Sequence, residues 1–285
     1  MELIAPGWKD YTVIDTGDCL RLERLGDVVI VRQCAQAFWP RTLGPADWER
    51  AHASHFRHDV GPGTWSYRRP VPDSWVIPNG PVAYEMRLTD FGHIGLFAEQ
   101  QTQWPWIASR LGPGLRAINL FAYTGGSTLA AASAGAHVTH VDAVKGVVSW
   151  ARQNAVHSQL GEAPIRWIVD DAVKFVEREV RRGVQYDAVI LDPPTFGRGP
   201  TGSVWKLEEN LVPLLADCER LLSDTPKFVL LSAHTPGVAA SSLRNLLGPL
   251  VQRRGGTLES GEMVQRAEAS ENLLPSGVYC RWTPN

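Results

Sequence analysis

The stretch Asn119-Leu-Phe-Ala-Tyr-Thr-Gly-Gly-Ser-Thr-Leu-Ala130 decides the fold of this 285-residue chain. Residues 116–121 are typical of a buried strand, and Thr124, Gly125 and Gly126 predict a tight turn that leads into a helix. Because this turn has little side-chain bulk, a ligand can approach the backbone where the helix presents free N–H groups. A Gly-Gly turn is also often a plain connection, so the stretch alone leaves a cofactor role open.

Three more predicted strands follow, and each of them runs into acidic residues. Successive strand ends are separated by about twenty to thirty residues, the length of one strand-helix-strand crossover. Right-handed crossovers would place these ends side by side at the carboxyl edge of one parallel sheet, where ligands bind. The strands and their acidic ends are 137–141 before Asp142, 165–169 before Asp170 and Asp171, and 186–191 before Asp192-Pro-Pro-Thr-Phe196.

The alternation of such units predicts an α/β protein. We expect a Rossmann-like, doubly wound, seven-stranded and mostly parallel sheet with an antiparallel edge strand, together with a small N-terminal β-rich subdomain. The expected domains are a β-rich, substrate-guiding subdomain (1–90), a bridging segment that meets the cofactor (91–111) and the main domain (112–285). Helices are expected at 101–111, 126–134, 145–158, 172–182, 207–222 and 238–253, and further strands at 227–232, 256–264 and 277–282.

Composition limits the class of protein. With 44% hydrophobic and 20% charged residues, the chain has the composition of a soluble globular protein. No apolar run approaches the roughly 20 residues that span a bilayer, and the N-terminus lacks the basic flank and apolar core of a signal peptide. We therefore expect a cytoplasmic protein without membrane contact.

Cysteine usage and net charge narrow the class further. Four scattered cysteines without CxxC spacing fit a reducing compartment: Cys19, Cys34, Cys218 and Cys280. A net charge of −2 excludes the overall basic field that is typical of non-specific nucleic-acid binders. Any contact with nucleic acid must be a local patch.

The N-terminal region contains histidines and tryptophans that could suggest a site. His52, His55 and His58 are spaced by three residues, but they lack a convincing partner set beyond Asp59, so we expect no metal. The tryptophans 39, 48, 65 and 75 are explained by packing in a β-rich subdomain, with a platform for stacking nucleic-acid bases as the alternative.

The glycine turn restricts the type of cofactor. It lacks the three glycines of the G-x-G-x-x-G pattern that binds dinucleotides, and no G-x-x-x-x-G-K-[ST] stretch is present to hold a triphosphate. A nucleoside-like ligand without phosphates remains. Asp142 could accept hydrogen bonds from both ribose hydroxyls, and Asp171 could accept one from an adenine amino group. Each residue alone is more often a helix N-cap or a first-turn acid.

These motifs resemble class I S-adenosylmethionine-dependent methyltransferases, over roughly residues 91–236. Within them, 119–126, Val141-Asp142, Asp170-Asp171 and 192–196 are similar to the ribosomal RNA base methyltransferases that modify C5 of cytosine or N7 of guanine. The resemblance implies S-adenosylmethionine as cofactor, with Asp142 at the ribose, Asp171 at the adenine and the 121–126 turn at the methionine end. The cofactor-binding residues that we expect are Asn119, Phe121, Ala122, Tyr123, Thr124, Gly125, Gly126, Asp142, Ala143, Asp170, Asp171, Ala172, Asp192 and, in the bridging segment beside Glu99, Gln100.

The chain departs from this family pattern at two places. Asn119 replaces the usual acidic residue at the end of the first strand, so any contact to the amino-acid end of the cofactor would be neutral and weaker. Where the cytosine-C5 enzymes of the branch carry Ser-Cys-Ser, this chain reads Ser232-Ala-His234. Methylation of C5 needs covalent activation by a cysteine, so this chemistry is disfavoured.

The loop 192–196 is expected to do the chemistry, with Asp192, Pro193, Pro194 and Phe196 as the catalytic residues. Methyl transfer from a sulfonium is an in-line displacement, and the protein mainly has to align donor and acceptor. The prolines stiffen the loop, Asp192 can accept a hydrogen bond from an amino or imino group, and Phe196 can stack on a planar base. A ring nitrogen with a free lone pair, such as guanine N7, would need no general base. Residues 197–202 are expected to form a mobile lid, with Arg198 as a contact for phosphate or carboxylate and His234 as a candidate proton acceptor.

The sequence therefore predicts a methyltransferase that modifies a nitrogen of an RNA base, ribosomal RNA first, through a local RNA-binding patch. A small-molecule or protein methyltransferase with the same donor is one alternative, and the near-neutral charge favours it. A non-catalytic module that binds S-adenosylmethionine is the other, and Asn119 favours it. The oligomeric state is not predicted.

Overall fold

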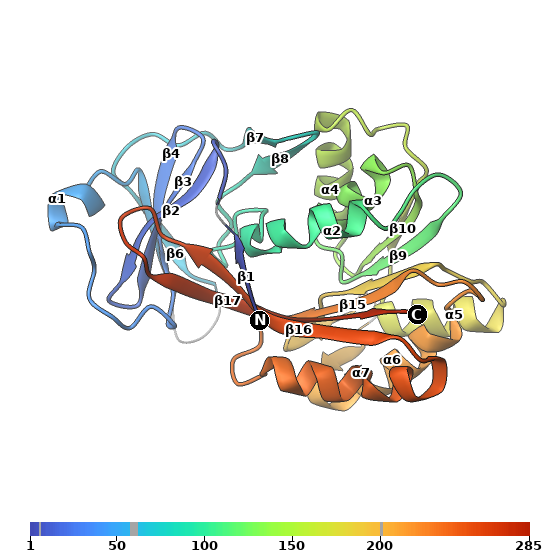
Figure 1. The fold of residues 1–285 in the computed structure, drawn as a ribbon. Helices are drawn as coiled ribbons and strands as arrows, with labels where there is room; N and C mark the ends of the chain where they lie inside the picture. The colour runs from blue at the N-terminus through green and yellow to red at the C-terminus, as the bar shows by residue number, and fades with distance from the viewer. Residues whose placement is uncertain (6, 58–61, 200–201) are drawn as a thin grey trace. The chain divides into compact units, whose positions relative to one another are not determined.

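The chain forms two compact units in the computed structural model, which describes residues 1–5, 7–57, 62–199 and 202–285 (Figure 1). The larger unit contains residues 1–3, 102–263 and 277–285, and the smaller unit contains residues 4–101 and 264–276. This division differs from the expected boundaries at residues 90 and 111. Residues 264–276 belong to the smaller unit because two long C-terminal strands pass from one unit into the other.

An eight-stranded sheet forms the centre of the larger unit, in the order β1-β16-β17-β15-β12-β9-β10-β11. Strand β9 pairs in parallel with β10 on one side and with β12 on the other, and β15 pairs antiparallel with β17. Seven strands were expected; the eighth, β1, is too short to show a periodic pattern. The strands are β1 (Glu2–Ala5), β9 (Arg116–Leu120), β10 (His137–Asp142), β11 (Ile165–Val169), β12 (Ala188–Leu191), β15 (Phe228–Ala233), β16 (Thr257–Arg266) and β17 (Leu273–Thr283).

Helices lie on both faces of the strands, as Figure 1 shows for α3 and α4 above and for α6 and α7 below. On the lower face, apolar side chains from α5, α6 and α7 pack against β9, β12 and β15 in one buried core. Removing such a buried side chain costs about 2–5 kcal/mol. The helices are α3 (Gly126–Ser133), α4 (Lys145–His157), α5 (Ala172–Arg181), α6 (Leu207–Arg220) and α7 (Ala240–Arg254), all close to the expected ranges.

The expected helix at 101–111 is broken into two shorter elements. A 3₁₀ turn, η1 (Ala98–Thr102), precedes the short helix α2 (Trp104–Ala108). Pro105 sits in the first turn of α2 and lacks the N–H needed to extend a longer helix through that point. The segment therefore cannot form one continuous helix.

The smaller unit is β-rich, as expected, with a five-stranded sheet in the order β2-β3-β4-β5-β6 and a separate β7-β8 pair. Leu22 and Val31 of the sheet pack on Trp48 and Ala51, so this tryptophan is a core residue. The elements are β2 (Tyr11–Gly17), β3 (Leu20–Leu25), β4 (Val28–Gln33), α1 (Pro45–Trp48), β5 (Ala53–Phe56), β6 (Thr64–Tyr67), β7 (Trp75–Asn79) and β8 (Val82–Met86).

A buried ionic cluster holds three strands of the smaller unit together. The Glu23 carboxylate is fully buried and accepts hydrogen bonds from Arg32 Nε at 2.6 Å, Arg32 Nη2 at 2.7 Å and the Tyr11 hydroxyl at 2.8 Å. Arg21 forms an ion pair with the same carboxylate at 3.3 Å. Burial alone would raise the pKa of Glu23, but the two guanidinium groups outweigh it and lower the pKa to about 2.

The histidines of this unit have packing partners. His52 Nδ1 accepts a hydrogen bond from the Val29 N–H at 3.1 Å, and the buried His55 ring lies 3.1 Å from the Asp90 carbonyl oxygen. His58 and Asp59 lie outside the described residues. Within the described ranges, no group of three potential metal ligands occurs, and no helix is both long and apolar enough to cross a membrane.

Candidate functional site

The strand order reverses at β9, and the expected site residues gather there. In an open α/β sheet, the crevice at the carboxyl ends of the strands beside such a reversal is the usual ligand site. The carboxyl ends of β9 and β12 are adjacent, and the Asp192 N–H lies 3.4 Å from the Leu120 carbonyl oxygen. All expected cofactor and catalytic residues between Asn119 and Phe196 belong to this unit. Gln100 and Glu99 belong to the smaller unit.

The turn after β9 has an unusual backbone. Phe121, Tyr123 and Gly125 have φ values of 55°, 49° and 90°, all in the left-handed region. Such a conformation costs a non-glycine residue on the order of 1–3 kcal/mol and persists only where the surroundings enforce it. Gly125 forms the N-cap of α3, and a Cβ at the next residue, Gly126, would lie only 3.0 Å from the Trp104 ring. Gly125 and Gly126 therefore leave the backbone at the N-terminus of α3 without side chains.

Three hydrogen bonds, to β10 and to α4, fix this turn. The Ala122 N–H donates to the Val141 carbonyl oxygen at 3.1 Å, and the Tyr123 N–H donates to Asp142 Oδ2 at 2.9 Å. From α4, the buried Asn154 Nδ2 donates to the Thr124 carbonyl oxygen at 2.9 Å. The sequence analysis did not predict a role for Asn154. Its only sign in the sequence is an amide side chain at a position of the helix where an apolar residue is expected.

Asp142 ends β10 and contacts the turn directly. Its Oδ2 accepts from Tyr123, and its Oδ1 accepts from the Val144 N–H at 3.0 Å. The Ala143 N–H is a third backbone donor to this carboxylate, which leaves it capacity for a further hydrogen bond. Burial raises the pKa of Asp142, although hydrogen bonds from the backbone oppose the shift. Backbone N–H groups, and not a positively charged side chain, therefore stabilise the charged form of this carboxylate.

Asn119 has a partner inside the protein. The side chain is 3% exposed, and its Nδ2 donates to Thr128 Oγ1 at 2.9 Å. Thr128 Oγ1 also lies 2.9 Å from Nδ1 of the fully buried His140. Burial, assisted by the positive charge of Arg152, lowers the pKa of His140 to about 3, so its ring is neutral. The Asn119 amide thus ties β9 to α3 and β10.

The acidic pair after β11 also has internal partners. Asp171 is the N-cap of α5, and its Oδ1 accepts from the Val173 and Lys174 N–H groups at 2.9 and 3.2 Å. Its Oδ2 accepts a hydrogen bond from Ser203 Oγ. Asp170 is paired with Arg178. The N-cap interpretation that the sequence left open therefore describes Asp171, and a contact to adenine would add to it.

The Asp192-Pro-Pro-Thr-Phe196 loop follows β12 and leads into a short strand that begins at Phe196, and β15 is the neighbour of β12 in the sheet. Asp192 Oδ1 accepts a hydrogen bond from Ser232 Oγ at 2.8 Å, and Oδ2 lies 3.3 Å from His234 Nε2. Both the Asp192 and His234 side chains are 25% exposed. Pro193 is buried, and the Phe196 side chain is 54% exposed. The loop thus combines a fixed carboxylate with an accessible aromatic ring.

Two short antiparallel strands flank the middle of the segment that was expected to form a mobile lid. Strand β13 (Phe196–Arg198) pairs antiparallel with β14 (Val204–Lys206), while Pro200 and Thr201 lie outside the described residues. Trp205 Nε1 donates to the Pro194 carbonyl oxygen at 2.7 Å, and its ring lies 4.7 Å from that of Phe121. Ser203 anchors the hairpin to Asp171. A run of Gly and Pro residues resembles a loop in sequence, which hid these contacts.

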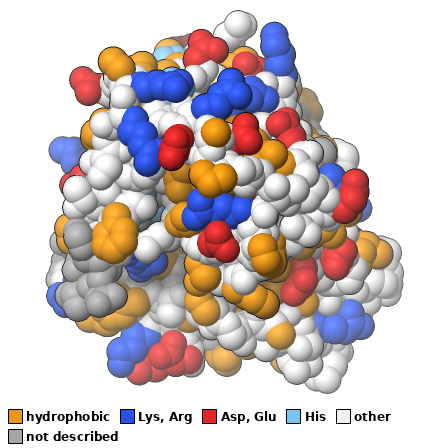
Figure 2. Space-filling view, turned by 90° about the vertical axis from the view of Figure 1, so that its left-hand side faces the viewer, with side chains coloured by type: hydrophobic (Ala, Val, Ile, Leu, Met, Phe, Trp, Pro, Cys, Tyr) orange, Lys and Arg blue, Asp and Glu red, His pale blue; other side chains and the backbone are white. Residues whose placement is uncertain are grey.

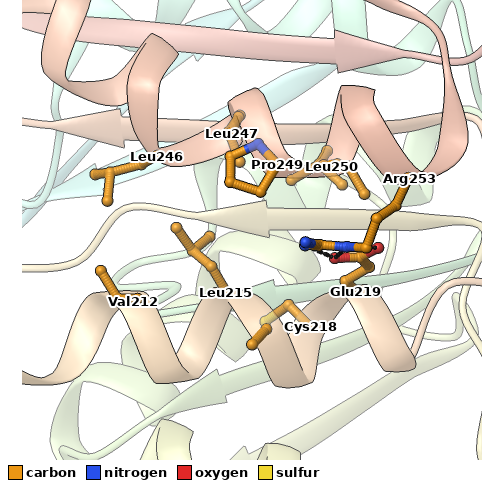
Figure 3. Close-up of a pocket in the computed structure, with 11 residues that line it drawn as sticks. Val212, Leu215, Cys218, Glu219, Leu246, Leu247, Pro249, Leu250 and Arg253 are labelled. Carbon is orange, nitrogen blue, oxygen red and sulfur yellow. Dashed lines mark hydrogen bonds and ion pairs between the residues drawn. The ribbon is translucent and has the colours of Figure 1, made fainter.

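A separate pocket of about 250 Å³ lies between α6 and α7 (Figure 3). Its walls are mainly apolar, and the ion pair between Glu219 and Arg253 lies at one end. The one strand residue in the wall, Val229, is near the amino end of β15, whereas the motifs described above lie at carboxyl ends. This pocket therefore does not belong to the candidate site.

A family model described as S-adenosylmethionine-dependent methyltransferase matches residues 48–227, which is more than half of the chain. The crystal structure of a SAM-dependent methyltransferase from Agrobacterium tumefaciens is 38% identical, covers 100% of this chain and 94% of its own, and has a TM-score of 0.95. A methyltransferase structure in complex with SAH, SMU.776, has a TM-score of 0.72 at 19% identity, covering 97% of this chain and 76% of its own, which shows the shared fold.

Relatives in the curated set are methyltransferases of ribosomal RNA. Ribosomal RNA large subunit methyltransferase K/L of Syntrophotalea carbinolica is 33% identical over 121 residues, which are 42% of this chain and 16% of that protein. The match thus spans less than a fifth of the relative's length. Together with the fold and the family match, these likenesses establish the donor as S-adenosylmethionine. The chain belongs to the S-adenosylmethionine-dependent methyltransferases.

Proposed function

We propose that this methyltransferase modifies a nitrogen of an RNA base, with ribosomal RNA as the first candidate, by in-line methyl transfer. One observation supports a planar acceptor most strongly: an exposed aromatic ring, Phe196, follows the fixed Asp192 carboxylate within four residues. Stacking of a base on an aromatic ring contributes roughly 1–3 kcal/mol, and it suits every base. Asp192 would accept a hydrogen bond from the acceptor, and Pro193 and Pro194 would hold the loop rigid.

The residues around the strained turn fit the donor. The remaining acceptor capacity of the Asp142 carboxylate suits a ribose hydroxyl, and the bare backbone at Gly125 and Gly126 suits the methionine end. When bound, S-adenosylmethionine supplies a methyl group on a positively charged sulfur. The proposed donor-binding residues of the larger unit, besides Asn119 with its structural role, are Phe121, Ala122, Tyr123, Thr124, Gly125, Gly126, Asp142, Ala143, Asp170, Asp171, Ala172 and Asp192.

The RNA acceptor is supported by the curated relatives and by local surface chemistry. The net charge of −2 leaves room only for a local patch, and Figure 2 shows Lys and Arg side chains interspersed with Asp and Glu side chains on one face of the molecule. In the smaller unit, exposed Arg57, Tyr67, Arg68 and Arg69 flank β5 and the edge strand β6. Arginines beside an aromatic ring are the usual contacts for single-stranded RNA. Such an acceptor would place the protein in the cytoplasm.

Transfer of tritiated methyl groups tests the proposal. The protein is incubated with labelled donor and either total RNA or a metabolite and protein extract, and Asp192→Ala serves as the inactive control. We expect label in the RNA fraction, and a Phe196→Ala variant should label RNA about 5- to 150-fold more slowly. The matched control is Phe38→Ala, which removes an exposed ring in the smaller unit. Label confined to the small-molecule or protein fraction would remove the RNA proposal and favour the alternative acceptors.

A further inference from the structure

A candidate proton acceptor lies beside Asp192. An acceptor nitrogen with a free lone pair would not need such a group, because it releases no proton on methylation. His234 directly follows β15, and its Nε2 lies 3.3 Å from Asp192 Oδ2. The other carboxylate oxygen accepts from Ser232 Oγ at 2.8 Å. Both carboxylate oxygens are therefore contacted by side chains of β15 and of the residue that follows it.

The imidazole has a fitted place in the fold. A Cβ at Gly277 of β17 would lie 2.9 Å from His234 Nδ1 and 3.0 Å from its Cε1, so only glycine lets the ring lie there. Asp192 faces the ring from the end of β12, and the uncharged Gly277 backbone faces it from β17. The ring remains 25% exposed, which gives it access to water. Position, partner and access together suit a group that receives and releases protons.

We propose that Asp192 and His234 together take up a proton from the acceptor, and hence that the acceptor nitrogen carries a hydrogen. This inference rests on the proposed function and narrows it to exocyclic amino groups and protonated ring nitrogens of RNA bases. The acceptor N–H donates to Asp192. As the nitrogen lone pair forms the new N–C bond, the C–S electron pair stays on sulfur, and the N–H proton passes through the Asp192 carboxylate to His234 Nε2. The resulting imidazolium beside the carboxylate then releases its proton to water.

Guanine N7 is the informative contrast. Its lone pair is free, so methylation there releases no proton and would make His234 unnecessary. An exocyclic amino group or an imino nitrogen must lose a proton after the methyl group arrives, and a positioned base contributes typically about 100-fold to such a step. Two measurements therefore test the same inference: which atom is methylated, and how much the reaction slows when His234 is replaced.

The test uses the full chain, labelled donor and total RNA, followed by digestion to nucleosides and mass spectrometry. We expect the methyl group on a nitrogen that carried hydrogen. We also expect His234→Gln to slow single-turnover transfer about 100-fold and to abolish the acidic limb of its pH profile. The matched control is His137→Gln, which removes an exposed histidine at the start of β10 and should leave rate and profile unchanged.

A second measurement does not depend on activity. In ¹⁵N-histidine spectra of the protein without RNA, the His234 titration should shift to lower pH in Asp192→Asn, because the imidazolium loses its carboxylate partner. Product on N7, or an unchanged rate in His234→Gln, would overturn this inference while leaving RNA methylation intact. An unshifted titration would overturn it as well. The absence of any methylated RNA would instead remove the proposed function, and the assignment of an RNA N–H acceptor would fall with it.

Discussion

Glu23 in the smaller unit is fully buried and Asp142 in the larger unit is partly buried, and their pKa values shift in opposite directions. Burial raises the pKa of both carboxyls. At Glu23 two arginines outweigh this effect and lower the pKa to about 2, so the charge is fully compensated inside the protein. At Asp142 the compensation comes from backbone N–H groups alone, and the pKa remains raised.

This difference separates a structural carboxylate from one that is suited to a ligand. Glu23 uses its oxygens on Arg32, Arg21 and Tyr11, and it joins strands that would otherwise bury unpaired groups. Asp142 lies at a strand end beside a strained turn, and its oxygens keep acceptor capacity. Perturbed titration combined with spare hydrogen-bonding capacity is what a binding site requires. The following variants break each side of the comparison in turn.

The largest effect is expected for Glu23→Ala. Removing one partner of a buried ion pair leaves the arginine charges uncompensated and costs about 3–5 kcal/mol of folding free energy. Urea denaturation measures the loss, and hydrogen exchange followed by peptide mass spectrometry should locate it in residues 11–33. Glu49→Ala is the matched control because Glu49 is exposed. A denaturation midpoint equal to that of the control would contradict the structural role of Glu23.

The next effect is expected for Asp142→Ala, which acts on binding more than on folding. Charged hydrogen bonds are each worth about 1.5–3 kcal/mol, so the affinity for S-adenosylhomocysteine should fall about 10- to 150-fold. Isothermal titration calorimetry measures this change. Asp187→Ala is a suitable comparison, because that carboxylate accepts from the Arg116 N–H at the opposite end of β9. Equal losses of affinity in both variants would show that Asp142 has no special place at the ligand.

Acidification should separate the two carboxylates without any mutation. The raised pKa of Asp142 means that it gains a proton above the ordinary range of aspartate, so binding of S-adenosylhomocysteine should weaken as the pH falls through that value. The contribution of Glu23 to stability is complete above its ordinary pKa of 4.5 and is lost as the pH falls toward 2. Calorimetry and circular dichroism between about pH 4 and 7 should show weaker binding before unfolding. Simultaneous loss of both signals would contradict the comparison.

Much of the larger unit could be predicted because its signals are local. The pattern predicts a helix over 172–182, and α5 spans Ala172–Arg181, since Asp171 caps its start and apolar residues recur at helical spacing. Strands β10 to β12 were predictable as mainly apolar runs that end at acidic residues. The expected class of fold and the S-adenosylmethionine donor are confirmed by the sheet order and the family match.

The rest depends on contacts between residues far apart in the chain. Strand β1 joins the sheet beside a strand from the other end of the sequence, and residues 264–276 belong to the smaller unit for the same reason. Asn154, Ser203 and Trp205 act through hydrogen bonds over eleven or more positions, and no local pattern marks such bonds. The β13-β14 hairpin was not predicted, because the glycines in this segment favour a loop when only neighbouring residues are considered.

The smallest effect, and the sharpest test of the strained turn, is expected from two glycine variants. At Gly125 the φ of 90° and a Cβ position 3.3 Å from Ala151 Cβ make alanine unfavourable, so Gly125→Ala should destabilise the protein by about 1–2 kcal/mol. Gly146 lies inside α4 with no neighbouring atom near its Cβ position, so Gly146→Ala should stabilise by about 0.5–1 kcal/mol. Urea denaturation therefore measures opposite signs for the same added methyl group. If both variants changed the free energy of unfolding in the same direction, the backbone of the turn would be able to relax freely. Such a turn could not form a preorganised binding surface for the donor beside Asp142.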